Sequence, residues 1–524
     1  MDLDEKIGQL FAVPARTGDI DTAIRHVRDN DVGGVIWFQS TAEETARVNE
    51  TLQSIARTPL LISADLEAGL GMRFTDADWW LPAMALAATG DPSLAEEQGR
   101  VTAREALAIG VNHILAPVAD VNCDPRNPVI NTRSFGEDPD EVAQYVAAFV
   151  RGVQSEGALA TAKHFPGHGD THVDSHRALP VLDVTRERLQ RVELVPFRAA
   201  VAEGVASVMV GHLAVPSLDS AAAPVRTEFE NVYGTTREEV PSAGTMPATL
   251  SRPIIDVLRR ELGFEGLVLT DAMDMGGLAA HFDAGEAAVR AIEAGNDMVL
   301  YSSDTDAAIA AVREAVRSGR LTEARIDESV ARIMKAKREV TAVIPSVSEG
   351  PGGEGGAESG FVHHPRPQVP RSTLGMTDGN AHLTLDDIAA RAITLVRDTN
   401  QLLPLRDQSI AIRVFSADDR LDVALEALSG ACAIGEADVI LLLLGIRPKS
   451  GVGQIVVPEE AKRIAQEHAR KTIAVSFGSP YVVHDLGDVS TFICAWGPQP
   501  VMQRAAVRAL RAEAPMTGRL PVTL

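Results

Sequence analysis

The sequence contains few cysteines and no long apolar run, and each shortage excludes a class of protein. Its three cysteines, Cys123, Cys432 and Cys494, are widely spaced and odd in number, so they predict neither a disulfide framework nor a zinc cluster. This usage is typical of a reducing cytoplasm. No run of about 18 apolar residues occurs, so the sequence predicts no membrane-spanning helix.

Positive charge is also scarce. The chain has 49 Lys and Arg against 72 Asp and Glu, a formal net charge of −23. Nucleic acid is therefore not an expected partner, because binding phosphates requires a basic surface. The first residues, MDLDEK, lack the basic start and the apolar stretch of a secretory signal.

What the chain does contain is a repeating pattern of short apolar runs and helical stretches within its first 305 residues. One helix is clearly delimited, with Ser251 as its N-cap and Gly263 after its last turn. Apolar runs that alternate with helices predict strands buried on both faces of a parallel sheet. No glycine-rich phosphate fingerprint follows the first run, and seven or eight units in about 340 residues predict a (β/α)8 barrel. The runs lie at 33–38, 60–65, 113–118, 158–164, 207–212, 267–271 and 298–301.

Polar side chains stand where several of these runs end. Barrel enzymes hold their chemistry at the carboxyl ends of the strands. One such residue could simply end its strand, but the repetition predicts a shared site. The residues are Asp65, Asp120, Lys163, His164, His212 and Asp271.

Composition divides the chain into three parts. A helix over 325–339 closes a first, catalytic domain of residues 1–340. The part 341–384 is rich in Gly, Pro and Ser between 345 and 380 and predicts a flexible linker or insertion. Residues 385–524 predict a second, smaller α/β domain, for which we expect a structural role. Its expected elements are a helix over 389–395 and strands near 409–415, 438–445, 472–477 and 491–496.

The segment KHFPGHGDTHVDSH at 163–176 is the most informative one. On a helix, its four histidines would line up as metal ligands, but Pro166 and Gly167 prevent that helix. The segment therefore predicts a loop across the barrel mouth, and a metal-dependent barrel hydrolase stays an alternative from another class. The histidines are His164, His168, His172 and His176.

Asp174 and His176 are separated only by Ser175, so their side chains can meet in a turn. A carboxylate beside an imidazole fixes its tautomer and favours its charged form, which is how a general acid/base is assembled. A salt-linked loop histidine without a catalytic role is the alternative. Asp271 ends a predicted strand and suits a nucleophile for an acetal carbon, with a histidine in place of the usual second carboxylic acid.

Several short motifs stand at the strand ends and loops of the predicted barrel. They are IGQL at 7–10, DLEAG at 65–69, NPVINTRSFG at 127–136, KHF at 163–165, GHG at 167–169, GFEGLVLTDAM at 263–273 and GND at 295–297. Together they resemble the motifs of glycoside hydrolase family 3, in which KHF with GHG is shared family-wide. The stretch GDTHVDSH at 169–176 resembles the NagZ-type β-N-acetylglucosaminidase branch of that family.

The resemblance implies a role for each candidate residue. Asp271 would form a covalent glycosyl-enzyme, and His176 with Asp174 would protonate the leaving oxygen and then deprotonate water. No metal or organic cofactor is expected, and the substrate would be a small carbohydrate. The residues that would hold the sugar hydroxyls are Asp65, Arg73, Arg133, Lys163 and His164.

The implied reaction is retaining hydrolysis of terminal β-linked N-acetylglucosamine, from muropeptide fragments or chitooligosaccharides. Two alternatives lie within the family: a β-glucosidase or β-xylosidase, and a phosphorylase, since a histidine acid/base does not repel an incoming phosphate. Substrate assistance by the acetamido group is the alternative to a covalent intermediate.

Overall fold

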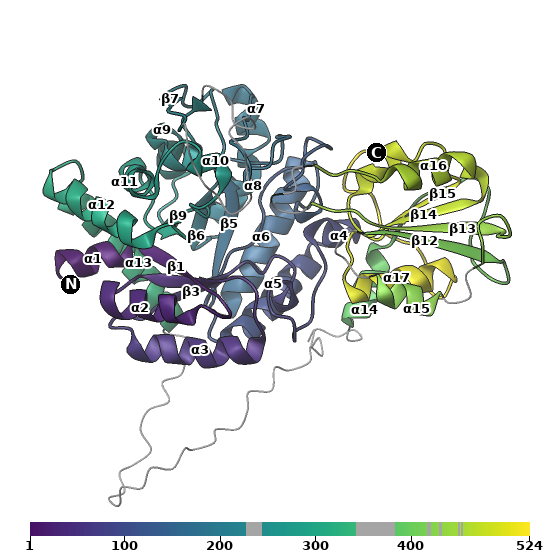
Figure 1. The fold of residues 1–524 in the computed structure, drawn as a ribbon, viewed down its shortest axis with the longest axis horizontal. Helices are drawn as coiled ribbons and strands as arrows, with labels where there is room; N and C mark the ends of the chain where they lie inside the picture. The colour runs from purple at the N-terminus through teal and green to yellow at the C-terminus, as the bar shows by residue number, and fades with distance from the viewer. Residues whose placement is uncertain (227–243, 342–382, 417–420, 429–431, 449–450, 452–453) are drawn as a thin grey trace, which may run out of the picture.

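The computed structural model describes residues 1–226, 244–341, 383–416, 421–428, 432–448, 451 and 454–524. Two α/β units lie side by side, with the N-terminal unit in purple to green and the C-terminal unit (383–524) in yellow-green (Figure 1). The predicted linker at 345–380 lies outside the described residues. The boundaries 1–340, 341–384 and 385–524 therefore stay predictions.

The N-terminal unit is built around an eight-stranded parallel sheet in the order β10-β1-β2-β3-β4-β5-β6-β9. A parallel bridge between Leu269 and Met298 links β9 to β10 and brings the sheet round to a nearly closed barrel. The predicted barrel fold is confirmed. The strands are β1 (Phe11–Ala15), β2 (Gly34–Trp37), β3 (Leu61–Ala64), β4 (His113–Ile114), β5 (Leu159–Phe165), β6 (Ser207–Val210), β9 (Leu267–Thr270) and β10 (Val299–Leu300).

The seven apolar runs of the sequence coincide with seven of these strands, and β1 is the strand that the runs omit. Pro14 lies within β1, and proline normally marks an edge or a broken strand. The carbonyl of Ala12 accepts from the backbone N–H of Tyr301, the residue after β10. Because backbone groups two residues apart in a strand point to the same side, the nitrogen of Pro14, which has no hydrogen to donate, also faces β10. There β10 has already ended at Leu300, the partner of Ala12, and no ladder bond is lost.

Helices surround the barrel (Figure 1). Ser251 caps α9 as predicted, because its hydroxyl accepts from the backbone N–H of Ile254, and Gly263 has φ +70°. The helix predicted over 325–339 lies within α13. The helices are α1 (Leu3–Gln9), α2 (Ile20–Asn30), α3 (Ala42–Ile55), α4 (Ala83–Ala88), α5 (Ser93–Ala108), α6 (Pro139–Ser155), α7 (Arg186–Arg191), α8 (Leu194–Ala202), α9 (Arg252–Asp256), α10 (Gly276–Ala279), α11 (Ala284–Ala294), α12 (Thr305–Arg317) and α13 (Glu323–Thr341).

The C-terminal unit contains a five-stranded sheet in the order β11-β15-β14-β13-β12, parallel except for β11. The helix predicted over 389–395 ends at Ala392 instead. Ile393 has extended backbone, and Thr394 begins a strand, as β-branched residues favour. The elements are α14 (Leu385–Ala392), β11 (Thr394–Asp398), β12 (Ile410–Ser416), α15 (Asp422–Ala427), β13 (Val439–Gly445), α16 (Glu459–Glu467), β14 (Thr472–Ser476), β15 (Thr491–Cys494) and α17 (Pro500–Leu510).

The two units are in direct contact. Helix α14 packs on α4, and Arg391 pairs with Asp91 at 3.1 Å beside it. The side-chain amide of Asn122, in the loop after β4, donates to the hydroxyl of Tyr481 at 2.9 Å. The C-terminal unit therefore reaches the barrel at the loops that follow its strands. Among the described helices, none combines the length and apolarity needed to cross a bilayer.

Candidate active site

A cavity of about 880 Å³ opens at the carboxyl ends of the barrel strands. Seven of the predicted site side chains line it, and Asp174, Asp120 and His212 do not. Asp174 is hydrogen-bonded to His176, Asp120 to His164, and His212 to Thr249 and the carbonyl of Ala272. The structure thus brings together residues from separate strand ends and loops. The lining residues among them are Asp65, Arg73, Arg133, Lys163, His164, His176 and Asp271.

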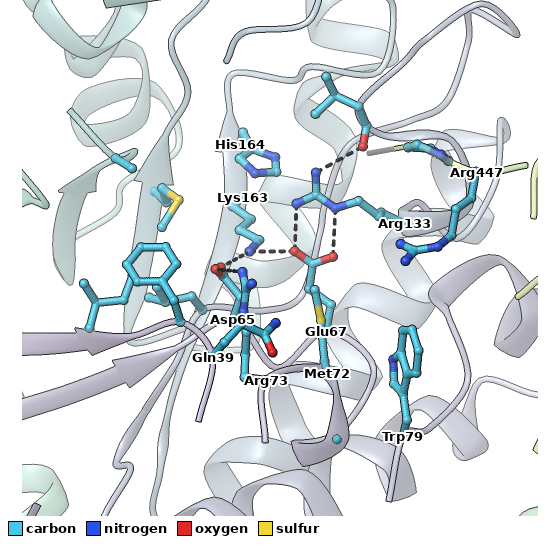
Figure 2. A pocket seen from close by; sticks show the side chains of 18 of the residues that line it. Gln39, Asp65, Glu67, Met72, Arg73, Trp79, Arg133, Lys163, His164 and Arg447 are labelled. Carbon is cyan, nitrogen blue, oxygen red and sulfur yellow. Dashed lines mark hydrogen bonds and ion pairs between the residues drawn. The ribbon is translucent and has the colours of Figure 1, made fainter. Parts of the chain in front are cut away.

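A chain of ion pairs forms the floor of this cavity (Figure 2). The ammonium group of Lys163 lies 2.7 Å from a carboxylate oxygen of Asp65 and 2.7 Å from one of Glu67. Arg133 donates to both oxygens of Glu67, at 2.9 and 2.7 Å, and Arg73 pairs with Asp65. These mutual bonds fix each side chain in place, as recognition of sugar hydroxyls requires.

The charges of this cluster hold one another ionised. Burial alone would raise the pKa of Asp65, but the charges of Lys163 and Arg73 outweigh it and hold that pKa below its usual range. Burial likewise opposes ionisation of Glu67, and Arg133 and Lys163 outweigh it, so its pKa also lies well below the ordinary value. The floor therefore offers charged donors and acceptors throughout the neutral pH range.

Asp174 and His176 form the predicted pair. The imidazole Nδ1 lies 2.8 Å from Asp174 Oδ1, and the backbone N–H of His176 donates to the same oxygen at 2.9 Å. The other oxygen of Asp174 accepts from the backbone N–H of Gly451, in the C-terminal unit, at 2.7 Å. Burial opposes ionisation of Asp174, but the bond to His176 outweighs it and lowers its pKa. This carboxylate is thus fixed and charged beside the imidazole.

Asp271 directly follows β9. Its backbone N–H donates to Val210 at 3.0 Å and continues the strand ladder, while its Oδ1 accepts from the backbone N–H of Ala272 at 2.8 Å. Burial would raise the pKa of this carboxyl, but the neighbouring His164 and His212 side chains and the bond from the backbone N–H of Ala272 outweigh it and lower the pKa. A fixed, ionised carboxylate in a pocket can act as a nucleophile.

Helix α10 joins the Asp271 strand to the loop of the acid/base pair. The backbone N–H groups of Gly276 and Gly277 donate to the carbonyls of His176 and Ser175 at 2.9 and 3.0 Å. A Cβ at Gly276 would lie 2.7 Å from the carbonyl oxygen of His176, so a side chain there would displace the loop. Helix α10 therefore fixes the position of the His176 loop relative to Asp271.

The histidines of the loop have separate partners. His164 Nδ1 lies 2.8 Å from an oxygen of Asp120, and His168 Nδ1 lies 2.8 Å from the hydroxyl of Thr171. Burial lowers the pKa of His168 to about 4, so its ring is neutral at neutral pH. Within the described part of the chain, no cluster of three or more His, Cys, Asp or Glu side chains could hold a metal ion.

The chain matches Glycosyl hydrolase family 3 N terminal domain over residues 2–336. It belongs to glycoside hydrolase family 3. A Cellulomonas fimi protein named Beta-N-acetylglucosaminidase/beta-glucosidase is 32% identical over 558 residues, which cover 99% of this chain and 93% of that protein. A Beta-hexosaminidase of Pseudomonas aeruginosa is 34% identical over 283 residues, 53% of this chain and 77% of that protein.

A solved structure extends the similarity over both units. The glycoside hydrolase family 3 beta-N-acetylglucosaminidase from Paenibacillus sp. str. FPU-7 is 29% identical and superposes with a TM-score of 0.80, covering 100% of this chain and 99% of that one. This chain is therefore a family 3 enzyme in sequence and in fold.

Sequence patterns missed three side chains of this family 3 site. Glu67 stands two residues beyond Asp65 in the DLEAG motif, but the strand-end rule selected the aspartate alone. Trp79 and Arg447 carry no local signal, since Trp79 lies in a loop of the barrel unit and Arg447 in the C-terminal unit.

The C-terminal unit, for which the sequence predicts a structural role, also reaches the cavity. Gly451 contacts Asp174, and Arg447, Pro448 and Arg504 line the cavity. The reason is that the loop after β13 and helix α17 border the cavity, an arrangement that depends on how the two units pack rather than on local sequence.

Proposed function

We propose that this chain is a retaining β-N-acetylglucosaminidase, which hydrolyses terminal β-linked N-acetylglucosamine. The observation that carries the proposal is the hydrogen-bonded Asp174–His176 pair in the same cavity as the ionised Asp271. The name of the Paenibacillus structure supports N-acetylglucosamine as the sugar, whereas the name of the Cellulomonas relative includes both N-acetylglucosaminidase and glucosidase activity.

In the first step, Asp271 attacks the anomeric carbon and forms a glycosyl ester while the glycosidic bond breaks. The imidazolium of His176 gives its Nε2 proton to the leaving oxygen, and Asp174 stabilises the charge at Nδ1. In the second step, neutral His176 takes a proton from water. That water attacks the anomeric carbon, and Asp271 leaves as a carboxylate, so the β configuration is retained.

The ion-paired side chains of the cavity floor bind the sugar hydroxyls. Donors on Lys163, Arg133 and Arg73 and acceptors on Asp65 are each fixed by a charged neighbour, so they lose little freedom when a hydroxyl binds. His164, held by Asp120, completes the predicted set. Hydrogen bonds to the sugar that strengthen as the sugar ring flattens would stabilise the transition state.

We also propose that the substrates are short β-linked oligosaccharides, from peptidoglycan turnover or from chitin, and that the enzyme is cytoplasmic. Three free cysteines support a reducing compartment. Cell fractionation with an antibody against the chain checks this location, and recovery of the enzyme outside the cell would contradict it.

A comparison of aryl glycosides tests the proposed activity. We expect kcat/KM for 4-nitrophenyl β-N-acetylglucosaminide to exceed that for the matching glucoside by about tenfold or more, because the acetamido group adds binding contacts. NMR of the first product should show the β anomer. A preference for the glucoside or xyloside, or a product of α configuration, would contradict the proposal.

A further inference from the structure

His212 is buried two residues after the end of β6, and the proposed reaction gives its imidazole no role. Its Nε2 lies 2.9 Å from the backbone carbonyl oxygen of Ala272, the residue that follows Asp271. Its Nδ1 lies 2.7 Å from the hydroxyl of Thr249. The ring does not line the cavity, so its influence on the reaction passes through these neighbours.

The two contacts specify how the ring is protonated. A carbonyl oxygen accepts hydrogen bonds and cannot donate them, so Nε2 carries a hydrogen. Burial lowers the pKa of His212, which leaves the ring uncharged at neutral pH, with a lone pair on Nδ1. The Thr249 hydroxyl also lies 3.0 Å from the carbonyl of Gly211, but the contact with the ring is the shorter one. Because two facing lone pairs would repel, Thr249 donates to Nδ1 and thereby selects the tautomer of His212 that donates to Ala272.

Ala272 connects this pair to the nucleophile. Its backbone N–H donates to Oδ1 of Asp271 at 2.8 Å, while its carbonyl accepts from His212. Because peptide units are planar, two dihedral angles at the Ala272 Cα separate the N–H from the carbonyl. A carbonyl that is fixed from outside the turn thus limits how far the N–H can move, together with the carboxylate oxygen bonded to it.

Backbone bonds hold the two residues on either side of Ala272. The N–H of Asp271 donates to the carbonyl of Val210 at 3.0 Å, and the N–H of Met273 donates to that of Leu300 at 3.0 Å. These bonds fix where the turn begins and ends. The imidazole of His212 adds a side-chain anchor at the residue between them, whose N–H reaches the carboxylate.

Attack on an anomeric carbon requires the carboxylate oxygen to approach from a defined direction, and a displacement of about 1 Å can cost about a hundredfold in rate. Resting on the proposed function, we propose that His212 and Thr249 form a positioning pair that sets the orientation of the Asp271 carboxylate for this attack. The side chains that bind the sugar are held through separate ion pairs. The pair therefore acts on the rate of attack and not on sugar binding.

The rate at which a 2-deoxy-2-fluoro glycoside labels Asp271 isolates the attack step. Saturation kinetics of the labelling gives a rate constant for attack and a dissociation constant for the glycoside. Thr249→Val keeps the shape of the side chain but removes the donor to Nδ1. For this variant we expect the rate constant to fall about tenfold or more, with the dissociation constant within about twofold of the wild type. Thr249→Ser keeps the hydroxyl and should restore most of the rate.

Two variants of His212 test the other half of the pair. His212→Phe keeps a ring without a donor and should lose at least as much rate as Thr249→Val. His212→Gln carries an amide that can donate to Ala272 and should recover part of the rate. Thr161→Val is the matched control, because the buried Thr161 hydroxyl lies 2.9 Å from Nε2 of His113, between β4 and β5 rather than beside β9. It should label at the wild-type rate.

The inference is overturned if Thr249→Val labels at the wild-type rate, if the loss is confined to the dissociation constant, or if Thr161→Val loses as much rate. Melting temperatures show which variants are folded, and if His212→Phe is unfolded, the two Thr249 variants decide. A wild type that cleaves the aryl glucosaminide but takes up no label at Asp271 also overturns the inference. If the wild type does neither, the proposed function itself fails.

Discussion

Three hydrogen bonds to one carboxylate decide how His176 is held. Asp174 accepts from the ring and the backbone of His176 and from the backbone of Gly451, and its side chain is wholly buried. The first two contacts follow from the spacing Asp174-Ser175-His176 and could be predicted from the sequence. The third could not, since Gly451 is 277 residues away and carries no side chain that a motif would reveal.

Replacement of His176 tests its role as the acid/base. For His176→Ala we expect a loss of about a hundredfold or more on disaccharides, and a smaller loss on aryl glycosides whose leaving groups need no proton. Azide should partly rescue the variant, because a small anion needs no general base. Steady-state kinetics over a series of leaving groups measures both effects.

Asp174→Ala is the matched variant, and it should show the same trend more weakly because the imidazole remains. Equal impairment of His176→Ala on good and poor leaving groups, together with no response to azide, would remove this histidine from the mechanism. His168, His172 or a carboxylate would then take its place as the candidate.

Among the elements, α10 has an effect larger than its four residues suggest. Its first two glycines donate to the loop that carries His176, while the Asp271 strand β9 precedes it in the chain. The nucleophile and the acid/base thus depend on one short helix for their relative position. Short β9 was predicted from its apolar run, but α10 was not, because a run of small residues has no helical periodicity.

Substitution at α10 tests this coupling. In Gly276→Ala the new Cβ would lie 2.5 Å from the carbonyl oxygen of Arg177 and 2.7 Å from that of His176, so the loop must shift. We expect kcat to fall about tenfold to a hundredfold on disaccharides, with a smaller change in melting temperature. Gly435→Ala is the control, since nothing lies within 4 Å of its added Cβ. Full activity of Gly276→Ala would show that the loop does not depend on this contact.

Apolar runs predicted seven barrel strands, and two kinds of strand escaped them. Strand β1 was not predicted because it contains Pro14, and proline normally argues against a strand. Here proline is tolerated because the neighbouring strand β10 ends before Pro14 would need a partner. Strand β11 was merged into the preceding helix, because the sequence from Ala392 to Thr394 fits either structure until the chain folds. Local patterns thus predict strands buried on both faces better than strands whose limits are set by their neighbours.

At the scale of the whole molecule, the cavity belongs to two units. The barrel supplies the ion-paired floor and Asp271, and the C-terminal unit supplies Gly451 and Arg447. The sequence predicts the barrel residues of the site because they directly follow apolar runs that form strands. The contribution of the second unit depends on contacts between segments far apart in the chain, so no local sequence pattern predicts it.

The proposed boundary between the units rests on composition, and limited proteolysis tests it. A segment rich in Gly, Pro and Ser cannot bury a core, so we expect the first cleavage between 345 and 380. Mass spectrometry of the early fragments locates the cut. Earlier cleavage within 1–340 or 385–524 would place the boundary elsewhere.

The most direct test of the central claim is to trap the covalent intermediate on Asp271. A 2-deoxy-2-fluoro glycoside with an activated leaving group slows the second step, so the glycosyl-enzyme should accumulate, and peptide mass spectrometry should locate the label on the peptide that contains Asp271. Asp271→Ala should fold, lose nearly all turnover and take up no label. A label on another residue, or an active Asp271→Ala, would contradict the account; the absence of any label together with strong inhibition by a thiazoline would show that the acetamido group, not Asp271, is the nucleophile.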